Sequence, residues 1–170
     1  MNKRLRKKVK KKERNEMIWA IYDGQVEKIE KLISSGIDIN GKDESGYTTL
    51  HWATQEGQLD VIKLLISLCA DVNIKDEEGF SPLYQAASQG NVQIVDYLID
   101  NGADIEIKSN DGTTPLIIAS CYDHLETVKL LVQKGSNIHS KVEDGNNALS
   151  FAEEYGNKEV AIFLREQGEK

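Results

Sequence analysis

The chain has 170 residues, of which 29% are charged, and its formal net charge is −7. It contains no run of about eighteen apolar residues, which excludes a membrane-spanning helix at the level of sequence. Its two cysteines fit no disulfide framework or zinc-binding spacing, and no phosphate-binding loop or nucleophile motif stands out. We therefore predict no catalytic, cofactor-binding or metal-binding residues.

The first fourteen residues, MNKRLRKKVKKKER, differ from the rest in charge. They hold nine Lys or Arg and one Glu, a formal charge of +8, so that the other 156 residues carry −15. We expect residues 1–14 to form a separate, flexible tail. The cations from Lys3 to Arg14 leave four roles open: attachment to nucleic acid or an anionic membrane, nuclear import, covering the chain's own acidic part, or improved solubility. The last is favoured, because the tail lacks aromatic residues and the repeats that follow are acidic.

From residue 17 onward the sequence repeats with a period of 33 residues. A small residue recurs at Ala20, Ala53, Ala86, Ala119 and Ala152, and a leucine at Leu32, Leu65, Leu98, Leu131 and Leu164. Glycine recurs at two further positions of each copy, with Asp123 and Cys69 as the two exceptions. A constant period of this size is typical of stacked-repeat proteins, whose short units bury their apolar faces against their neighbours.

The repeated segments are similar to those of a known family. TTLHWA, SPLYQA and TPLIIA resemble the Thr-Pro-Leu-His-x-Ala core of ankyrin repeats, and LISSGIDIN, LISLCADVN and LIDNGADIE resemble the end of each unit. The resemblance covers residues 15–170 and implies an all-α solenoid. Each unit is then a helix, a tight turn, a second helix and a protruding hairpin loop. The implied units are residues 15–46, 47–79, 80–112, 113–145 and 146–170, with the first and last as caps.

The residues of single units agree with this assignment. In the second unit Leu50, Trp52 and Ala53 fall on one helical face, and apolar residues then recur at three- and four-residue spacing. A hydroxyl residue is placed to cap each first helix, at Thr48, Ser81 and Thr114. The glycines are expected to close helices at positive φ, so Asp123 and Cys69 are predicted to be strained in those positions.

Thr49, His51 and Glu56 do not form a predicted active site. In the other copies the position of His51 is filled by Ile18, Tyr84, Ile117 and Ser150, so no partner base recurs with it. The resemblance implies that this histidine is structural, and His124 and His139 fall in ordinary repeat positions.

A second row of equivalent positions lies among the core leucines and alanines. It consists of Trp19, Trp52, Gln85, Ile118 and Phe151. Because apolar residues flank every member, we predict that the row forms a buried seam.

The resemblance also implies a binding surface, because in ankyrin folds the hairpin tips and the exposed side of the first helices form a concave face. Carried onto this chain, it predicts protein-binding residues at Tyr47, Glu56, Glu77, Glu78, Phe80, Gln89, Lys108, Asp111 and Tyr122. Phe80 and Tyr122 are the predicted aromatic anchors, with carboxylates as a rim, although packing of Tyr47 and Phe80 on the next hairpin is equally open. Lysines share one position at Lys42, Lys75, Lys108 and Lys141 and either pair locally or help to select a partner.

The predicted function is non-catalytic recognition of a protein partner by a cytoplasmic, monomeric protein. Single-domain ankyrin proteins of this size resemble inhibitors, immunity-type factors, host-directed effectors and adaptors alike. The alternative is a factor held to nucleic acid or an anionic membrane by the basic tail. The sequence does not identify the partner.

Overall fold

The structure is a computed structural model that describes the backbone of residues 3–168 and the side chains of residues 12 and 14–168. Over this range it contains ten helices and no strand beyond one isolated bridge between Lys141 and Asn147. The predicted all-α class is confirmed. The helices are α1 (Lys3–Tyr22), α2 (Val26–Ser34), α3 (Thr49–Gln55), α4 (Leu59–Ser67), α5 (Pro82–Ser88), α6 (Val92–Asp100), α7 (Pro115–Cys121), α8 (Leu125–Gln133), α9 (Ala148–Glu154) and α10 (Lys158–Gly168).

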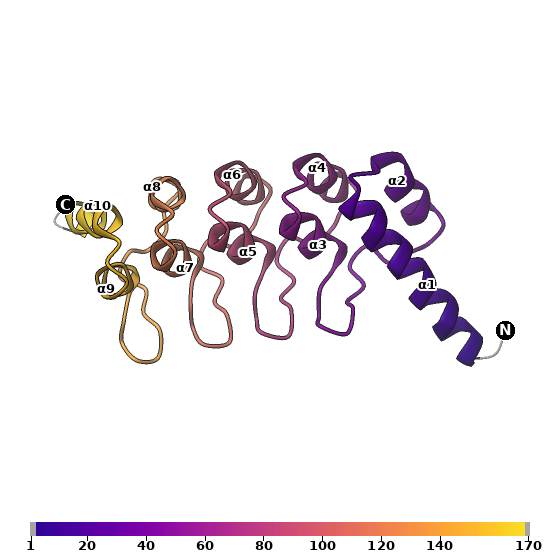
Figure 1. Ribbon diagram of the computed structural model, residues 1–170, viewed down its shortest axis with the longest axis horizontal. Coiled ribbons are helices and arrows are strands. Elements are labelled where there is room, and N and C mark those ends of the chain that lie inside the picture. Colours follow the sequence, from indigo (N-terminus) through magenta and orange to yellow (C-terminus); the bar gives the residue numbers. More distant parts are fainter. Residues whose placement is uncertain (1–2, 169–170) are drawn as a thin grey trace. The chain divides into compact units, whose positions relative to one another are not determined.

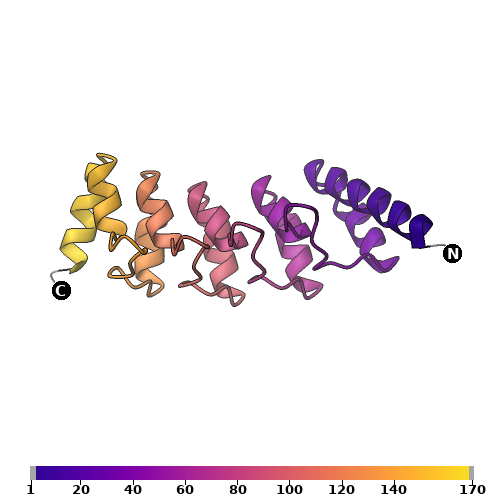
Figure 2. The ribbon, with the colours of Figure 1, turned by 90° about the horizontal axis from the view of Figure 1, so that it is seen from below.

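The chain divides into two compact units, residues 1–71 with α1–α4 and residues 72–170 with α5–α10. In the second unit α7 packs against both α5 and α9, and α8 packs against both α6 and α10. Figure 1 shows these two rows, with the hairpin loops extending beyond the row of first helices. Figure 2, seen from the hairpin side, shows the helix pairs of this unit following one another.

Each short first helix begins at a residue whose side chain accepts a backbone N–H from three residues further on. The Ser81 hydroxyl accepts from the Tyr84 N–H at 3.1 Å, and Thr114 accepts from Ile117 at 3.3 Å. Thr48 caps α3 in the same way. An unpaired helix N-terminus is costly, so these hydroxyls fix where the helices start. The predicted caps are confirmed.

The recurring alanines and leucines form the core of the stack. The five alanines of the series are 0% exposed, as are the three central leucines, Leu65, Leu98 and Leu131. The small side chain lets neighbouring helices approach closely, and the leucine fills the space between them. The period of 33 residues therefore corresponds to one packed layer.

His51 is a structural residue. It is 0% exposed, and its Nδ1 lies 3.2 Å from the Thr48 backbone N and 2.9 Å from the Thr48 hydroxyl, which closes a reciprocal cap on α3. His124 also bridges backbone, since its Nε2 lies 2.9 Å from the Ser88 carbonyl oxygen of the preceding repeat.

The backbone of the predicted tail is helical, whereas a flexible segment was expected over residues 1–14. Helix α1 starts at Lys3 and continues through the first repeat to Tyr22. No glycine or proline interrupts this stretch, and Lys, Arg, Glu and Leu are good helix formers. Arg14 is half-buried and lines a cavity of about 140 Å³ together with Met17, Ile37 and Thr49. The tail and first repeat therefore share one helix.

The two exceptions among the repeat glycines have the predicted backbone conformation. Cys69 has φ 65° and Asp123 has φ 61°, the left-handed region that costs L-residues roughly 1–2 kcal/mol. We expect Asp123→Gly and Cys69→Gly each to raise the melting temperature followed by circular dichroism. Lower melting temperatures for both variants would contradict the strain.

Candidate functional site

The predicted binding residues are divided between the two compact units. Tyr47 and Glu56 belong to the first unit. The second unit contains Glu77, Glu78, Phe80, Gln89, Lys108, Asp111 and Tyr122. All are exposed except Tyr47 and Phe80, which are half-buried. Their role in binding stays a prediction.

The hairpin of the third repeat is organised by Asp76. Its Oδ1 accepts the backbone N–H groups of Glu78 at 3.0 Å and Phe80 at 2.8 Å. The Phe80 ring stacks on the Tyr84 ring, with 4.3 Å between centroids and 3° between planes. Because this contact lies within its own repeat, Phe80 has a structural role beside any role in binding.

The hairpin of the fourth repeat stacks on that of the third. The Asn110 backbone N–H donates to the Glu78 carbonyl at 3.1 Å, and its side-chain amide donates to the Glu77 carbonyl at 2.9 Å. Asp111 accepts from the Ser109 hydroxyl and from the Thr113 N–H, and these bonds hold the pKa of its carboxyl below the usual range. Asp111 is therefore an exposed, ionised group at neutral pH.

The lysines of the hairpins form a ladder of bonds to backbone. The Lys75 ammonium donates to the Lys108 carbonyl at 2.6 Å, and the Lys108 ammonium donates to the Lys141 carbonyl at 3.4 Å. These bonds run from one repeat to the next. The bond that the structure describes for Lys108 is thus a link between hairpins, which differs from the local pairing that was one of the two alternatives left open by the sequence.

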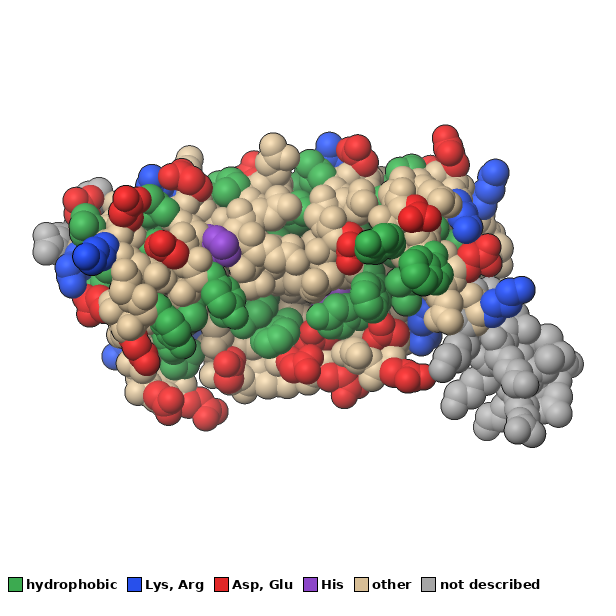
Figure 3. Space-filling view, viewed as in Figure 1, with side chains coloured by type: hydrophobic (Ala, Val, Ile, Leu, Met, Phe, Trp, Pro, Cys, Tyr) green, Lys and Arg blue, Asp and Glu red, His purple; other side chains and the backbone are tan. Residues whose placement is uncertain are grey.

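Tyr122 lies on a surface that extends over two neighbouring first helices. Tyr122 and Tyr155 hold equivalent positions at the ends of α7 and α9 and are 58% and 60% exposed. Half-buried apolar side chains lie one turn earlier on the same helices. We call this the α7–α9 surface: Ile118, Cys121, Tyr122, Phe151, Glu154 and Tyr155. In the part of Figure 3 that shows the second unit, hydrophobic side chains gather over the first helices, above a rim of carboxylates at the hairpins.

The side chains of the α7–α9 surface interact with one another. The Cys121 thiol and the Tyr155 hydroxyl interact electrostatically across the two repeats. Burial raises the pKa of the Cys121 thiol, and the negative charge of Glu154 adds to this effect. Burial likewise raises the pKa of Tyr84, with further contributions from Asp111 and Tyr122. The aromatic residues and both carboxylates therefore form one electrostatically connected area.

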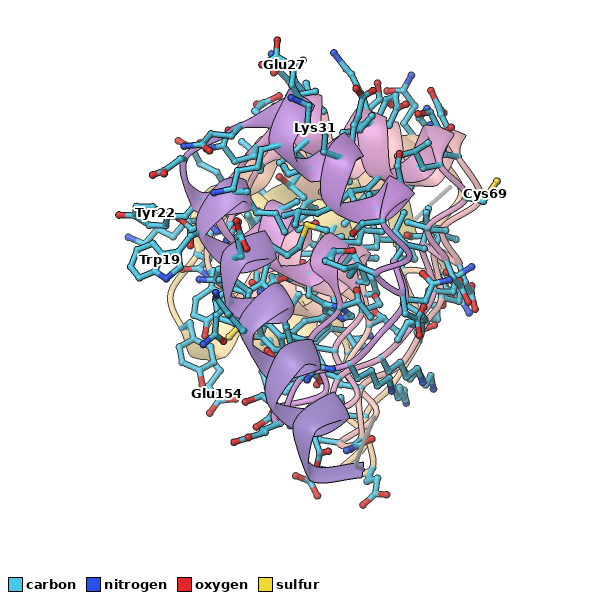
Figure 4. The ribbon with its side chains drawn as sticks, turned by 90° about the vertical axis from the view of Figure 1, so that its right-hand side faces the viewer. Trp19, Tyr22, Glu27, Lys31, Cys69 and Glu154 are labelled. Atoms are coloured by element: carbon cyan, nitrogen blue, oxygen red, sulfur yellow. The ribbon has the colours of Figure 1, made fainter. Side chains whose placement is uncertain are left out.

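The first unit has its own aromatic cluster. Trp19 and Tyr22 are 64% and 58% exposed on α1, with their rings in an edge contact at 6.1 Å. Figure 4 shows both projecting to the same side of this helix. The Trp52 indole donates to Asp43 at 3.0 Å and packs edge-on against Tyr47 at 5.3 Å. Glu56 is exposed at the end of α3.

The prediction that this row of residues is buried is wrong for its first member, and three other members are only partly buried. Trp19 is exposed, Trp52, Ile118 and Phe151 are half-buried, and Gln85 alone is buried. The row lies on the exposed side of the first helices, between the core alanine and the solvent. Three surface residues were not identified from the sequence: Ile118, Phe151 and Tyr155. Tyr155 could have been found, because it lies one 33-residue period after Tyr122.

Neither a metal-binding cluster nor a membrane-spanning helix is found among the described residues. No group of three or more His, Cys, Asp or Glu side chains among them is placed to hold a metal ion. No helix in that part of the chain is long and apolar enough to cross a membrane.

Comparison with known proteins gives one family match. The chain matches the family described as "Ankyrin repeats (3 copies)" at residues 17–109, 63–142 and 105–170, which together span nearly all of it. A search among curated proteins gave no significant match.

Proposed function

Because the chain belongs to the ankyrin-repeat family, whose repeats generally mediate protein–protein interaction, we propose that it recognises a protein partner without catalysing a reaction. The binding face consists of the exposed side of the first helices and the hairpin tips. Inhibitors, immunity-type factors, effectors and adaptors all fit this activity, and a reducing cytoplasm fits the unpaired thiols of Cys69 and Cys121.

The observation that carries this proposal is the exposure of large aromatic side chains on the first helices. Tyr122 and Tyr155 leave most of their area in solvent, while Ala119 and Ala152 on the same helices are fully buried. Tyrosine is enriched among the few residues that dominate binding energies, particularly when polar groups surround it. Fixed aromatic side chains on a packed scaffold also lose little conformational entropy when a partner binds.

Tyr122→Ala should weaken the free energy of partner binding by at least about 2 kcal/mol, the scale of an interface hot spot. The partner is first recovered by pull-down with the wild-type chain and identified by mass spectrometry, and its affinity is then measured by calorimetry. Ile162→Ala is the matched control, because Ile162 is 53% exposed on α10, a second helix. Loss of binding in the Ile162 variant alone would place the partner on the second helices. Phe80→Ala is a poorer test, since its ring also packs on Tyr84.

The basic tail supports a second activity that can be separated from the first. Changing Lys10, Lys11 and Lys12 to Gln should leave the partner's affinity within about twofold when it is measured above 150 mM salt, because attraction between charges further apart than about 8 Å is largely screened there. A different result would favour the tail as the binding element. In that case the wild type would be retained on DNA or anionic vesicles in a salt-dependent way, and the Gln variant would lose both this retention and partner binding.

A further inference from the structure

The second unit contains many more acidic than basic residues, and the ion pairs described for its basic side chains lie outside the α7–α9 surface. Residues 72–170 hold seventeen Asp or Glu and eight Lys or Arg. The ion pairs within this described part use the second helices and the end of the stack: Lys129–Glu126, Lys134–Asp96, Lys134–Asp100 and Arg165–Glu153. Lys75 and Lys108 donate to hairpin carbonyls. None of these pairs includes Asp111 or Glu154.

Two carboxylates act electrostatically on residues of this surface and its border. Glu154 acts electrostatically on Cys121 and Tyr155, and Asp111 acts on Tyr84, which also responds to Tyr122. Both carboxylates are exposed and are therefore accessible to a ligand. Tyrosine rings attract cations through their faces, with the strongest effect where carboxylates reinforce the attraction.

A buried carboxylate adds to the negative potential at the edge of this area. Asp76 is 7% exposed, and its Oδ2 has no hydrogen-bond partner among the described residues. In the preceding repeat the equivalent Asp43 Oδ2 accepts the Trp52 indole N–H at 3.0 Å, whereas Gln85 occupies the tryptophan position in the third repeat. Asp76 also acts electrostatically on Tyr84. Its charge is thus less compensated than that of Asp43.

We propose that the α7–α9 surface, together with Asp111 in the hairpin that precedes α7, binds a positively charged segment of the partner protein, with arginine side chains stacked on Tyr122 and Tyr155 and paired with Asp111 and Glu154. This inference rests on the proposed function and identifies the kind of partner. Arginine suits the surface because its planar guanidinium stacks on aromatic rings while its N–H groups donate to carboxylates. Packed helices lie about 8–10 Å apart, and an extended chain advances about 3.3 Å per residue. Three residues therefore span the two tyrosines.

The test uses the full chain and a twelve-residue peptide of four Gly-Ser-Arg repeats, with Gly-Ser-Gln and Gly-Ser-Glu peptides as controls. Binding is measured by fluorescence anisotropy at low and high salt, and the site is mapped by amide chemical shifts in NMR spectra. We expect the arginine peptide alone to bind, with shifts concentrated at residues 109–122 and 151–156. Equal binding of the glutamine peptide, or shifts concentrated on α6, α8 and α10, would overturn the proposal.

Two double variants separate the contributions of rings and charges. The first variant removes both rings, Tyr122→Ala with Tyr155→Ala, and the second removes both charges, Asp111→Asn with Glu154→Gln. Each variant should bind the arginine peptide about tenfold more weakly, as expected for losing two cation–π or charge contacts. The control removes two exposed carboxylates of α10, Glu159→Gln with Glu166→Gln, and should change affinity less than about twofold. If the control has the same effect as Asp111→Asn with Glu154→Gln, the attraction is a general charge effect and the proposal fails.

The chain's own basic tail is the competing occupant. In spectra without peptide, a variant with Lys7, Lys8, Lys10, Lys11 and Lys12 changed to Gln should match the wild type at α7 and α9. Shifts there would assign the surface to the tail instead of a partner. Failure of the arginine peptide leaves the proposed function intact if the Tyr122→Ala variant still loses the recovered partner. That result would show a partner of other chemistry on the same surface.

Discussion

Replacing Leu98 with alanine should lower the free energy of unfolding by about 2–5 kcal/mol, the range for removing a large side chain from a packed core. Leu98 is 0% exposed on α6, in the layer that also contacts α5 and α8. Nearby side chains are held by the rest of the stack and can fill the cavity only in part. The melting temperature, followed by circular dichroism, should fall by about 5–15 °C for a protein of this size.

The effect should also be uneven along the chain. A repeat stack is stabilised by interfaces between neighbours, so hydrogen exchange in the Leu98→Ala variant should accelerate most in α5, α6, α7 and α8. Leu68→Ala is the matched control, because Leu68 is 39% exposed and loses much less packing. A mild acceleration spread evenly over all repeats would contradict the nearest-neighbour description.

Gly79→Ala should destabilise the protein by about 1–3 kcal/mol more than Gly145→Ala, although both glycines occupy the same hairpin position with the same φ of +84°. Both variants incur the strain of a left-handed alanine, roughly 1–2 kcal/mol. A Cβ at Gly79 would lie 2.6 Å from the Asn110 backbone nitrogen and 2.5 Å from its Oδ1. At Gly145 a Cβ would meet nothing within 4 Å in the described structure.

The difference arises from the hydrogen bonds that Asn110 makes to the third hairpin. Moving Asn110 away breaks its bonds to the Glu77 and Glu78 carbonyls, each worth about 0.5–1.5 kcal/mol. The two variants are compared by urea denaturation, with an NMR spectrum to locate the change. Equal losses of stability would mean that the hairpins of neighbouring repeats do not support one another.

The repeat period and the ends of the helices could be predicted from sequence, because the signals are local and recur. Ser81 and Thr114 cap helices through backbone groups only three residues away. Positive φ at Cys69 and Asp123 follows from comparing one repeat with the next, since the turn geometry is the same in each copy. Such features need no knowledge of which residues meet in space.

The exposure of individual side chains was harder to predict. Trp19 and Ile118 stand among apolar neighbours in sequence, which suggested burial, yet their positions turn toward the exposed side of the first helices. Helix periodicity separates two faces but does not state how far a neighbouring layer covers the boundary between them. The same ambiguity concealed Tyr155, while the stacking of Phe80 on Tyr84 became clear only from the structure.

The sequence by itself determined the repeat family, the helical class, the structural role of His51 and a set of exposed polar positions on the hairpins. Only the tertiary structure decided that the lysine ladder donates to backbone, that Asn110 joins two hairpins and that Tyr122 and Tyr155 are both exposed on neighbouring first helices. The physical reason is the distance along the chain. Backbone preferences and caps act within one helical turn, whereas these contacts join residues about one repeat apart and depend on how the layers pack.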